Sequence, residues 1–479
     1  MSGDALIGLA MLLVMMAAVF AGFPVAFTLL FLAFAFGALS LGDRVLDLAY
    51  FQTLGLMRDE LLAAVPLFVF MGYVVQQAGL MERLFTALRL LMAPVRGSLF
   101  VVVILTSTAF AMATGIVGAA VPVLGLMAAP VMRKSGYDAR LAAGSIAAGG
   151  TLGMLIPPSV MLLVLGPVLG VSVVDLYAAA LGPGFMLAGL YLAWVLWRCR
   201  RNPSLGPPLP RELHATSPWQ IARELALGVV PLFVLIAATL GAILAGLATP
   251  TEAAGVGALG ALMLAWRRLT WPAFMDAARR TLATASMVLF LAVTSNVFGA
   301  VFARLGTADW LTQSLVALAL PTTAMLVLVA LLLFLLGWPF EWPAIVLVFV
   351  PIFYPVVNAL GVDMVWFGAL VAVTLQTAFL SPPVAMAAYY LRQVVREWPL
   401  GTIFRGMLEF MGIQVVAIAL LFVFPAVATW LPERLAESGA LDVSEPVPMW
   451  IEPWPDYGDS YPRIYRRWLE QSGGEAAGG

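Results

Sequence analysis

The chain is poor in the residues that build disulfides, zinc sites and charged surfaces. Cys199 is the only cysteine and His214 the only histidine, which excludes an intrachain disulfide and a Cys/His zinc cluster. Only 11% of the 479 residues are charged, against roughly 25% in a soluble domain. The formal net charge is −1, which gives no electrostatic case for binding nucleic acid.

Signatures of ATP use and of catalysis are also missing. No GxxxxGK[ST] phosphate loop occurs, so the chain is not expected to use ATP itself. No pair of a nucleophile and a base can be recognised, which argues against an enzyme. What is abundant is apolar: 62% of the residues are hydrophobic and the mean hydropathy is +1.00. This composition predicts an all-α polytopic membrane protein.

The first half of the chain, residues 1–197, contains a series of apolar segments long enough to cross a bilayer. The chain begins Met1-Ser2-Gly3-Asp4, without a basic region, so we expect a first transmembrane helix rather than a cleaved signal peptide. Crossings are predicted at 5–20, 23–41, 61–78 and 177–197. An interfacial segment is predicted at 44–58, and an amphipathic arm at 82–96.

Two further segments of the first half are apolar but interrupted. Residues 98–132 are too long for one comfortable crossing and are interrupted at Thr114 to Gly118. This predicts a re-entrant hairpin with its tip there. Residues 139–170 predict one crossing that is broken at Pro157-Pro158, because proline donates no backbone N–H.

A polar, proline-rich linker at 198–224 separates the first half from the second half, residues 225–431. The second half repeats the order of elements. It predicts crossings at 226–246, 252–266, 281–303 and 405–430, an arm at 306–320, a hairpin at 323–357 with its break at Gly337 to Pro343, and a broken crossing at 364–391. Residues 432–479 are more polar and predict either an extension that contacts a partner or a disordered tail.

Backbone-breaking residues recur at an offset of 225 positions. The matching residues are Pro130 and Pro355, Gly136 and Gly361, and Pro157-Pro158 and Pro382-Pro383. Each half has five crossings, and one topology puts the basic loops in the cytoplasm, so the second half is predicted to be inverted and both termini periplasmic. Two inverted repeats, each with a re-entrant hairpin and a broken helix, are typical of a secondary transporter.

The breaks predict sites for a cation and for a carboxylate side by side. Pro157 and Pro158 would leave the carbonyls of residues 153 and 154 free to coordinate a cation, and half-helix N-termini suit an anion. The alternative is that these prolines only kink their helices. Side-chain oxygens near the breaks are those of Ser107, Thr114, Thr151, Gln376, Thr377 and Ser381.

Four acidic residues in or beside apolar sequence need an interpretation. Glu341, between Pro339 and Pro343, is either a functional acid, because a carboxylate at membrane depth is costly, or a group that caps the next half-helix or pairs with an arginine. Glu252 is predicted to complete a capping box with Thr249. The other two, Asp138 and Asp363, are predicted helix N-caps.

Three stretches of the sequence resemble the large membrane subunit of tripartite ATP-independent periplasmic (TRAP) transporters. They are GYDARLAAGSIAAGGTLGMLIPPSVMLLVLG (136–166), TPTEA (249–253) and LQTAFLSPPVAMAAYYL (375–391). The resemblance covers roughly residues 5–430. It implies an elevator-type ion-transporter fold and sodium as the coupling ion, with no other cofactor.

The resemblance also implies where ions and substrate bind. The implied ion-binding residues are Ser107, Thr114, Gly115, Gly118, Gly150, Thr151, Pro157, Pro158, Gly337, Gln376, Thr377, Ser381, Pro382 and Pro383. The implied substrate-binding residues are Thr114, Ser159, Glu341 and Gln376. This chain departs from the family twice, with Thr-Gly-Ile-Val at 114–117 where many relatives have Ser-Gly-Ser-Ser, and with Glu341 where an aspartate is commoner.

Members of the family work with a small four-helix membrane subunit and a periplasmic solute-binding protein that delivers an organic anion. The resemblance therefore implies these two partners, contact with membrane lipid, and a place in the bacterial inner membrane. No small-subunit sequence is recognised at the N-terminus, so a separate partner chain is expected. The alternatives are a stand-alone carboxylate/sodium symporter of related fold and a non-transporting scaffold or proton-channel subunit.

Overall fold

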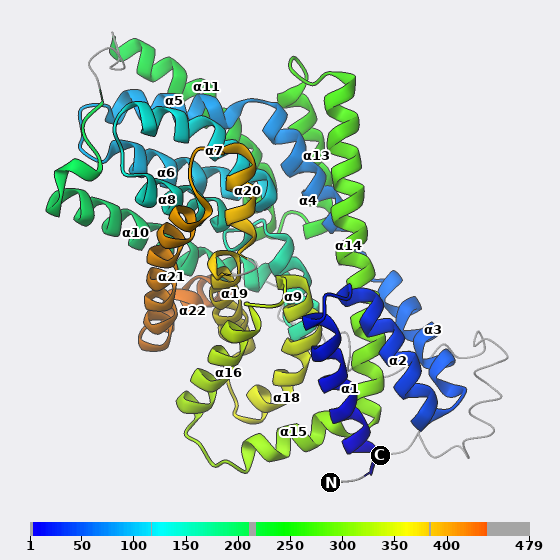
Figure 1. The fold of residues 1–479 in the computed structure, drawn as a ribbon. Helices are drawn as coiled ribbons and strands as arrows, with labels where there is room; N and C mark the ends of the chain where they lie inside the picture. Colours follow the sequence, from blue (N-terminus) through cyan, green and yellow to red (C-terminus); the bar gives the residue numbers. More distant parts are fainter. Residues whose placement is uncertain (1–2, 116, 210–216, 383–384, 438–479) are drawn as a thin grey trace.

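The computed structural model describes residues 3–115, 117–209, 217–382 and 385–437 (Figure 1). Every regular element in those ranges is a helix, so the predicted all-α fold is confirmed. Six of the helices are long and apolar enough to cross a membrane, and shorter apolar helices accompany them. The chain is thus a multi-pass membrane protein.

The first half consists of ten α-helices and a short 3₁₀ turn within the described ranges. They are α1 (Gly3–Phe20), α2 (Val25–Leu41), α3 (Arg44–Met57), α4 (Glu60–Gln77), α5 (Leu80–Met92), α6 (Ser98–Thr114), α7 (Val117–Lys134), α8 (Ala139–Thr151), the 3₁₀ turn η1 (Leu152–Met154), α9 (Val160–Leu169) and α10 (Val173–Arg201). The predicted hairpin is therefore α6 and α7, and the predicted broken crossing is α8 and α9.

The second half follows a 3₁₀ turn, η2 (Pro203–Leu205). Its elements are α11 (Pro218–Ile236), the π-helix η4 (Ala237–Gly241), α12 (Ala242–Leu244), α13 (Pro250–Ala265), α14 (Trp271–Arg304), α15 (Thr307–Val316), α16 (Thr322–Leu336), α17 (Trp342–Ala344), the π-helix η5 (Ile345–Phe349), α18 (Val350–Ala359), α19 (Met364–Leu380), α20 (Met386–Val394), α21 (Leu400–Val423) and α22 (Ala426–Glu437). The second hairpin is α16 with α17 to α18.

The offset between the halves is visible in the helix bounds. α7 begins at Val117 and α17 at Trp342, and α8 begins at Ala139 and α19 at Met364, so both pairs start 225 residues apart. The orientation of the second half relative to a membrane stays a prediction.

Three predicted helix starts are confirmed by side-chain hydrogen bonds. Asp138 accepts from the backbone N–H of Leu141 at 2.7 Å, and Asp363 accepts from that of Val365 at 2.7 Å. Thr249 and Glu252 exchange the two hydrogen bonds of a capping box. Each of these caps satisfies a backbone donor that the first helical turn leaves free.

The predicted last crossing, 405–430, is interrupted. α21 ends at Val423, two residues before Pro425, which donates no backbone N–H and disfavours a helical conformation in the residue before it. α22 then runs through residues 432–437, which the sequence had assigned to the polar tail. The rest of that tail lies outside the described residues.

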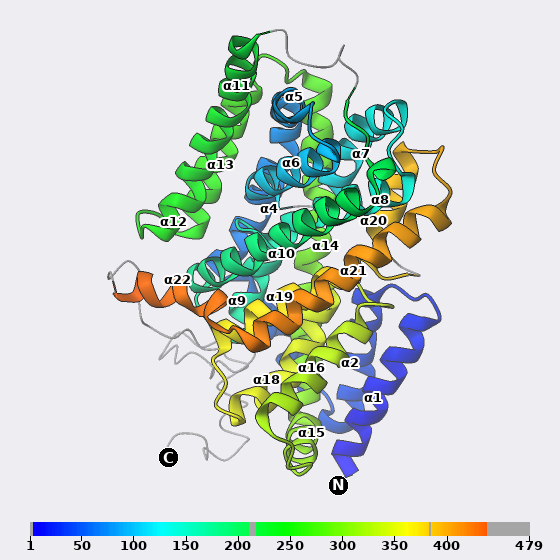
Figure 2. The ribbon, with the colours of Figure 1, turned by 90° about the vertical axis from the view of Figure 1, so that its left-hand side faces the viewer.

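Hairpins and broken crossings from the two halves pack against one another in the middle of the molecule. α8 contacts α21, α10 contacts α19, and α9 contacts both η5 and α19. Beside this centre, α4 packs on α13 and α14, and α2 packs on α14. These four helices, α2, α4, α13 and α14, are called the wall below (Figures 1 and 2). The core therefore brings together segments far apart in sequence.

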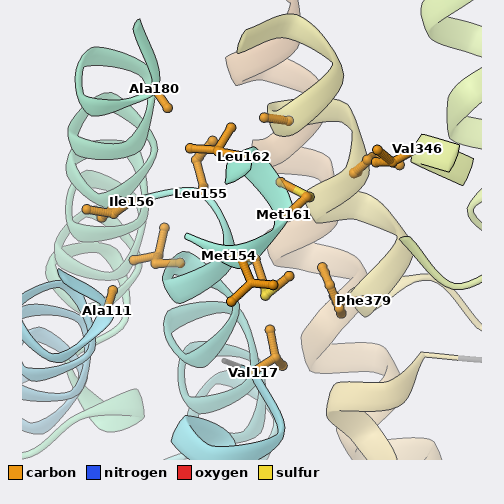
Figure 3. Packing of buried hydrophobic residues seen from close by; sticks show 14 of the residues in the cluster. Ala111, Val117, Met154, Leu155, Ile156, Met161, Leu162, Ala180, Val346 and Phe379 are labelled. Carbon is orange, nitrogen blue, oxygen red and sulfur yellow. The ribbon is translucent and has the colours of Figure 1, made fainter. Parts of the chain in front are cut away.

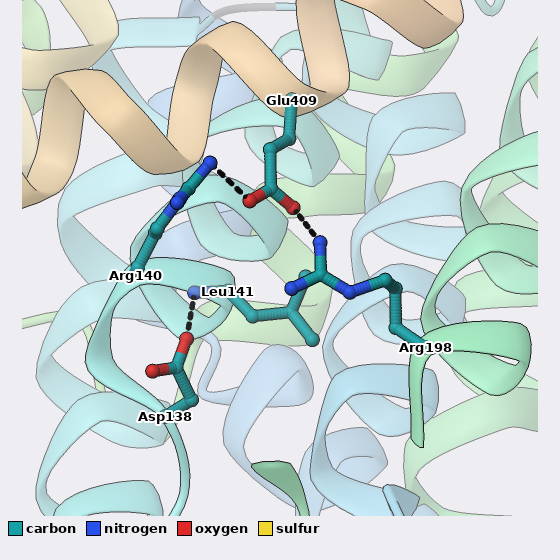
Figure 4. A network of polar contacts seen from close by, with 5 residues as sticks. All are labelled: Asp138, Arg140, Leu141, Arg198 and Glu409. Carbon is teal, nitrogen blue, oxygen red and sulfur yellow. Dashed lines mark hydrogen bonds and ion pairs between the residues drawn. The ribbon is translucent and has the colours of Figure 1, made fainter. Parts of the chain in front are cut away.

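One ion-pair network ties α21 to two helices of the first half (Figure 4). Glu409 forms ion pairs with Arg140 of α8 at 2.5 Å and with Arg198 of α10 at 2.6 Å, and only 10% of its side chain is exposed. Gly144 and Gly406 let α8 and α21 approach closely, since a Cβ on Gly144 would lie 2.6 Å from the Gly406 carbonyl oxygen. These contacts join the two halves.

Candidate functional site

A cavity of about 330 Å³ lies where the broken segments meet the wall of α4 and α14. Its lining comes from both halves of the chain: the tip between α6 and α7, η1 and α9, the break before α17, the end of α19, and α20. Figure 3 shows three of the lining side chains, Val117, Met154 and Phe379, around the first broken crossing. The predicted breaks therefore surround one space.

Four helix N-termini reach this cavity. Val117 begins α7, Val160 begins α9, Trp342 begins the continuous helix that ends at Ala359, and Met386 begins α20; all four starting residues line the cavity. The first turns of helices carry free N–H groups and partial positive charge. The backbone around the cavity is therefore suited to an anionic group.

At the first break, the hairpin tip packs directly on the proline pair. Gly115 has a φ of +59°, and a Cβ there would lie 2.7 Å from the carbonyl oxygen of Pro158. Only glycine combines this backbone conformation with so close an approach. A Cβ on Gly149 would lie 2.6 Å from Oγ of Ser107, so α6 and α8 also touch. Predicted residues Ser107, Gly115 and Pro158 thus belong to one packed cluster.

The prolines of this break predict that the backbone carbonyls of residues 153 and 154 have no hydrogen-bond donor. For Met154 this prediction is wrong. Its carbonyl oxygen accepts a hydrogen bond from the Ser159 hydroxyl at 2.5 Å. Ser159 is fully buried, and its own carbonyl accepts from Tyr177 at 3.3 Å. The serine therefore replaces the donor that Pro158 lacks. Ser159 does not line the cavity, and its contact with substrate stays a prediction.

The other hydroxyls of the first cluster donate within their own helices. Ser107 donates to the carbonyl of Val103 at 2.6 Å, and Thr114 donates to that of Phe110 at 3.1 Å. Thr151 donates to its own helix in the same way, at 2.8 Å. A hydroxyl whose hydrogen is so used still has lone pairs that can coordinate a cation. Gly150, which packs on Val121, completes this cluster.

The second break differs, because one polar side chain there has no partner. Gln376 is fully buried, and neither its Oε1 nor its Nε2 has a hydrogen-bond partner among the residues that the structure describes. Thr377 and Ser381 each donate backward along α19, both at 2.6 Å. Gly337 packs on Ala378, where a Cβ would lie 2.9 Å from the alanine Cβ. Pro382 is half-buried, whereas Pro383 lies outside the described residues.

Glu341 lines the cavity and is exposed to it. It stands at the N-cap position of α17 but makes no capping hydrogen bond. No ion pair found in the described ranges includes it. The capping and arginine-pairing alternatives are therefore not observed there, and the carboxylate is available to a ligand.

Of the remaining predicted residues, Gly115 and Gly118 line the cavity, and Gly118 packs on the ring of Tyr390. Thr114 and Gln376 are buried and do not line it.

Sequence reasoning missed three hydroxyl-bearing residues of the cavity. Tyr73 of α4 and Thr284 of α14 lie 3.3 Å apart, oxygen to oxygen, and Tyr390 of α20 belongs to the same lining. A tyrosine or threonine inside an apolar crossing was the available signal. It is weak, because such residues are common where membrane helices pack.

Comparisons with known proteins agree with this arrangement. Residues 9–427 match the family described as the tripartite ATP-independent periplasmic transporter, DctM component. The sialic acid TRAP transporter large permease protein SiaM of Vibrio cholerae is 32% identical over 86% of this chain and 96% of its own length. The C4-dicarboxylate TRAP transporter large permease protein DctM of Pseudomonas aeruginosa is 30% identical over 79% of this chain and 87% of its own.

A solved structure has the same fold. The YdaH transporter of Alcanivorax borkumensis aligns with a TM-score of 0.58 at 18% identity, over 90% of this chain and 100% of that one. At this identity the likeness concerns the fold alone. The match across residues 9–427 and the two large-permease relatives carry the assignment: the chain belongs to the DctM family of large permease subunits of tripartite ATP-independent periplasmic transporters.

Proposed function

We propose that this large permease imports an organic acid across the bacterial inner membrane by sodium symport. The observation that carries the proposal is that four helix N-termini line one cavity, while buried side-chain oxygens lie at the two breaks beside it. N-termini suit a carboxylate. Hydroxyl, carbonyl and amide oxygens are ligands suited to a small hard cation.

Two partners belong to the proposal. A periplasmic solute-binding protein would deliver the acid, and a small four-helix membrane subunit would pack on this chain. The relatives include a sialic acid transporter and a C4-dicarboxylate transporter, which supports an organic acid as the substrate class.

The proposed movement is that of an elevator. The hairpins and broken crossings, joined across the halves by Glu409, would move as one body against the wall of α2, α4, α13 and α14. The cavity lies between these two parts. Movement of one part past the other would therefore expose the substrate to each side in turn.

Uptake into proteoliposomes tests the proposal. The chain is reconstituted alone, with the small subunit, and with both partners, and labelled organic acids are supplied under an imposed sodium gradient. Uptake is expected only with both partners and only with the gradient. Uptake by the chain alone would favour the stand-alone symporter, and uptake that ignores sodium would contradict the coupling.

A further inference from the structure

A second, smaller pocket lies where α14 of the wall meets the second hairpin. Its volume is about 40 Å³, and it is separate from the central cavity because no residue lines both. α14 contributes Ser295 and Asn296 together with apolar residues. The residues that η5 and α18 contribute are all apolar: Leu347, Val348, Pro351 and Ile352. The pocket therefore lies on the surface along which the proposed elevator would move.

Two polar side chains of this pocket lack a protein partner. Ser295 is only 2% exposed and Asn296 only 7% exposed. Within the described ranges, neither Oγ of Ser295 nor Oδ1 of Asn296 has a hydrogen-bond partner. Nδ2 of Asn296 donates to the backbone carbonyl of Gln52 at 3.3 Å, so only the oxygen end of this amide is unpartnered. Buried polar groups nearly always have a partner, which points to a ligand in the pocket.

The lining decides which ligand fits. No charged side chain of the described residues lines the pocket, and two side-chain oxygens are fewer than the roughly six ligands that hard cations take. About 40 Å³ is far below the roughly 300 Å³ of a site for a drug-sized ligand. It exceeds the roughly 10–15 Å³ that one water molecule needs. Ala303 lines the pocket and is exposed, so water can enter beside it.

We propose that this pocket is a water site, filled by about one to three molecules, that keeps the contact between α14 and the second hairpin from closing into a dry interface. The water bonds to Ser295 and Asn296, which the apolar residues of η5 and α18 cannot do. Because water is replaced easily, these side chains stay bonded while the hairpin moves past them. The role in movement rests on the proposed function, whereas the water site itself does not.

Radiolytic labelling of the purified chain with its small subunit tests the water site. X-ray pulses split bound water into hydroxyl radicals, which oxidise the side chains beside it. Phe298 and Phe302 line the pocket and are only 2% and 3% exposed, so their oxidation reports local water rather than bulk solvent. Phe100, which is fully buried and lies outside the pocket, is the reference. Phe298 and Phe302 should oxidise several-fold faster than Phe100, and equal rates for all three would overturn the proposal.

A double variant, Ser295→Ala with Asn296→Leu, removes both unpartnered groups. Oxidation of Phe298 and Phe302 should fall toward that of Phe100. In the complete transporter with both partners, uptake at saturating substrate should be about twofold to tenfold slower, the equivalent of about one hydrogen bond, because the dry contact favours one position of the hairpin. Sodium half-saturation should stay the same.

Thr294→Val is the matched control on the same turn of α14. Thr294 is fully buried, its hydroxyl donates to the carbonyl of Leu291 at 3.1 Å, and it does not line the pocket. This variant should keep the wild-type labelling and uptake. Unchanged labelling in the double variant would overturn the assignment to Ser295 and Asn296, and lost labelling with wild-type uptake would overturn the role in movement. Labelling needs no substrate, so failure of the proposed function would show separately, as a wild-type transporter that takes up no acid.

Discussion

The two broken crossings have the same plan but differ in how fully their polar groups are bonded. At the first break, Ser107, Thr151 and Ser159 each donate to a backbone carbonyl. At the second, Gln376 is fully buried, and within the described part of the chain both ends of its amide are unpartnered. An unsatisfied buried polar group costs about 1–3 kcal/mol. The second break therefore has more to gain from a bound ion than the first.

The largest expected effect comes from removing a break. Pro157→Ala restores a backbone donor and lets the helix close over carbonyls that the ion would use. A lost ligand worth about 1.4 kcal/mol lowers ion affinity about tenfold, so uptake at low sodium should fall at least that much with membrane expression intact. Pro167→Ala, in the interior of α9 and away from the cavity lining, is the control. Wild-type uptake by Pro157→Ala would mean that the proline only kinks the helix.

Substitution of Gln376 should separate stability from transport. Gln376→Leu removes a buried amide without partners, so without sodium the free energy of unfolding should rise by about 1–2 kcal/mol. Its sodium-dependent uptake at low sodium should nevertheless fall by up to about tenfold, because one oxygen ligand is gone.

The matched variant is Thr151→Val at the corresponding place of the first break. It removes a hydroxyl that is already bonded, so it should lower stability by about 1 kcal/mol. Thermal unfolding in detergent measures both variants. Equal and same-signed stability changes would remove the contrast between the two breaks.

Glu341 takes part in none of the hydrogen bonds described at the two broken crossings. Its replacement should therefore affect transport and leave the stability of the fold unchanged. Glu341→Gln is expected to lower uptake about tenfold, the equivalent of one charge-assisted hydrogen bond of about 1.5 kcal/mol, with unfolding temperature unchanged. Glu82→Gln, on the exposed face of α5, controls for loss of a surface carboxylate. Unaltered uptake with Glu341→Gln would remove this residue from the substrate site.

The smallest effect on transport chemistry is expected at Glu409. Glu409→Gln keeps the shape but loses the charge that holds Arg140 and Arg198. The protein should lose about 1–3 kcal/mol of stability, while sodium half-saturation stays the same. A large change in sodium affinity with unchanged stability would mean that this network acts on the ion sites.

Local signals carried most of what could be predicted from the sequence. The proline pair of the first break, the glycine at the first hairpin tip, and the caps Asp138 and Asp363 each follow from backbone chemistry within a few residues, and the helices begin and end accordingly. The sequence predicts a crossing to residue 430, because the apolar run continues through Pro425. The helix α21 instead ends at Val423.

Contacts between distant segments were not predictable from such signals. Tyr73 and Thr284 are 211 residues apart in the chain, and only the packing of α4 against α14 brings them together. The hydrogen bond from Ser159 to Met154 depends on how the chain turns at the prolines. These features follow from tertiary packing, which hydrophobic pattern and breakers do not specify.

The most direct test of the account is thermal unfolding of the purified chain in sodium chloride and in potassium chloride of equal ionic strength. A ligand at about 100 times its dissociation constant stabilises the folded state by about 2.7 kcal/mol. Sodium, but not potassium, should therefore raise the unfolding temperature of the wild-type chain, and Gln376→Leu should lose most of that rise. Identical unfolding in the two salts would contradict the sodium sites.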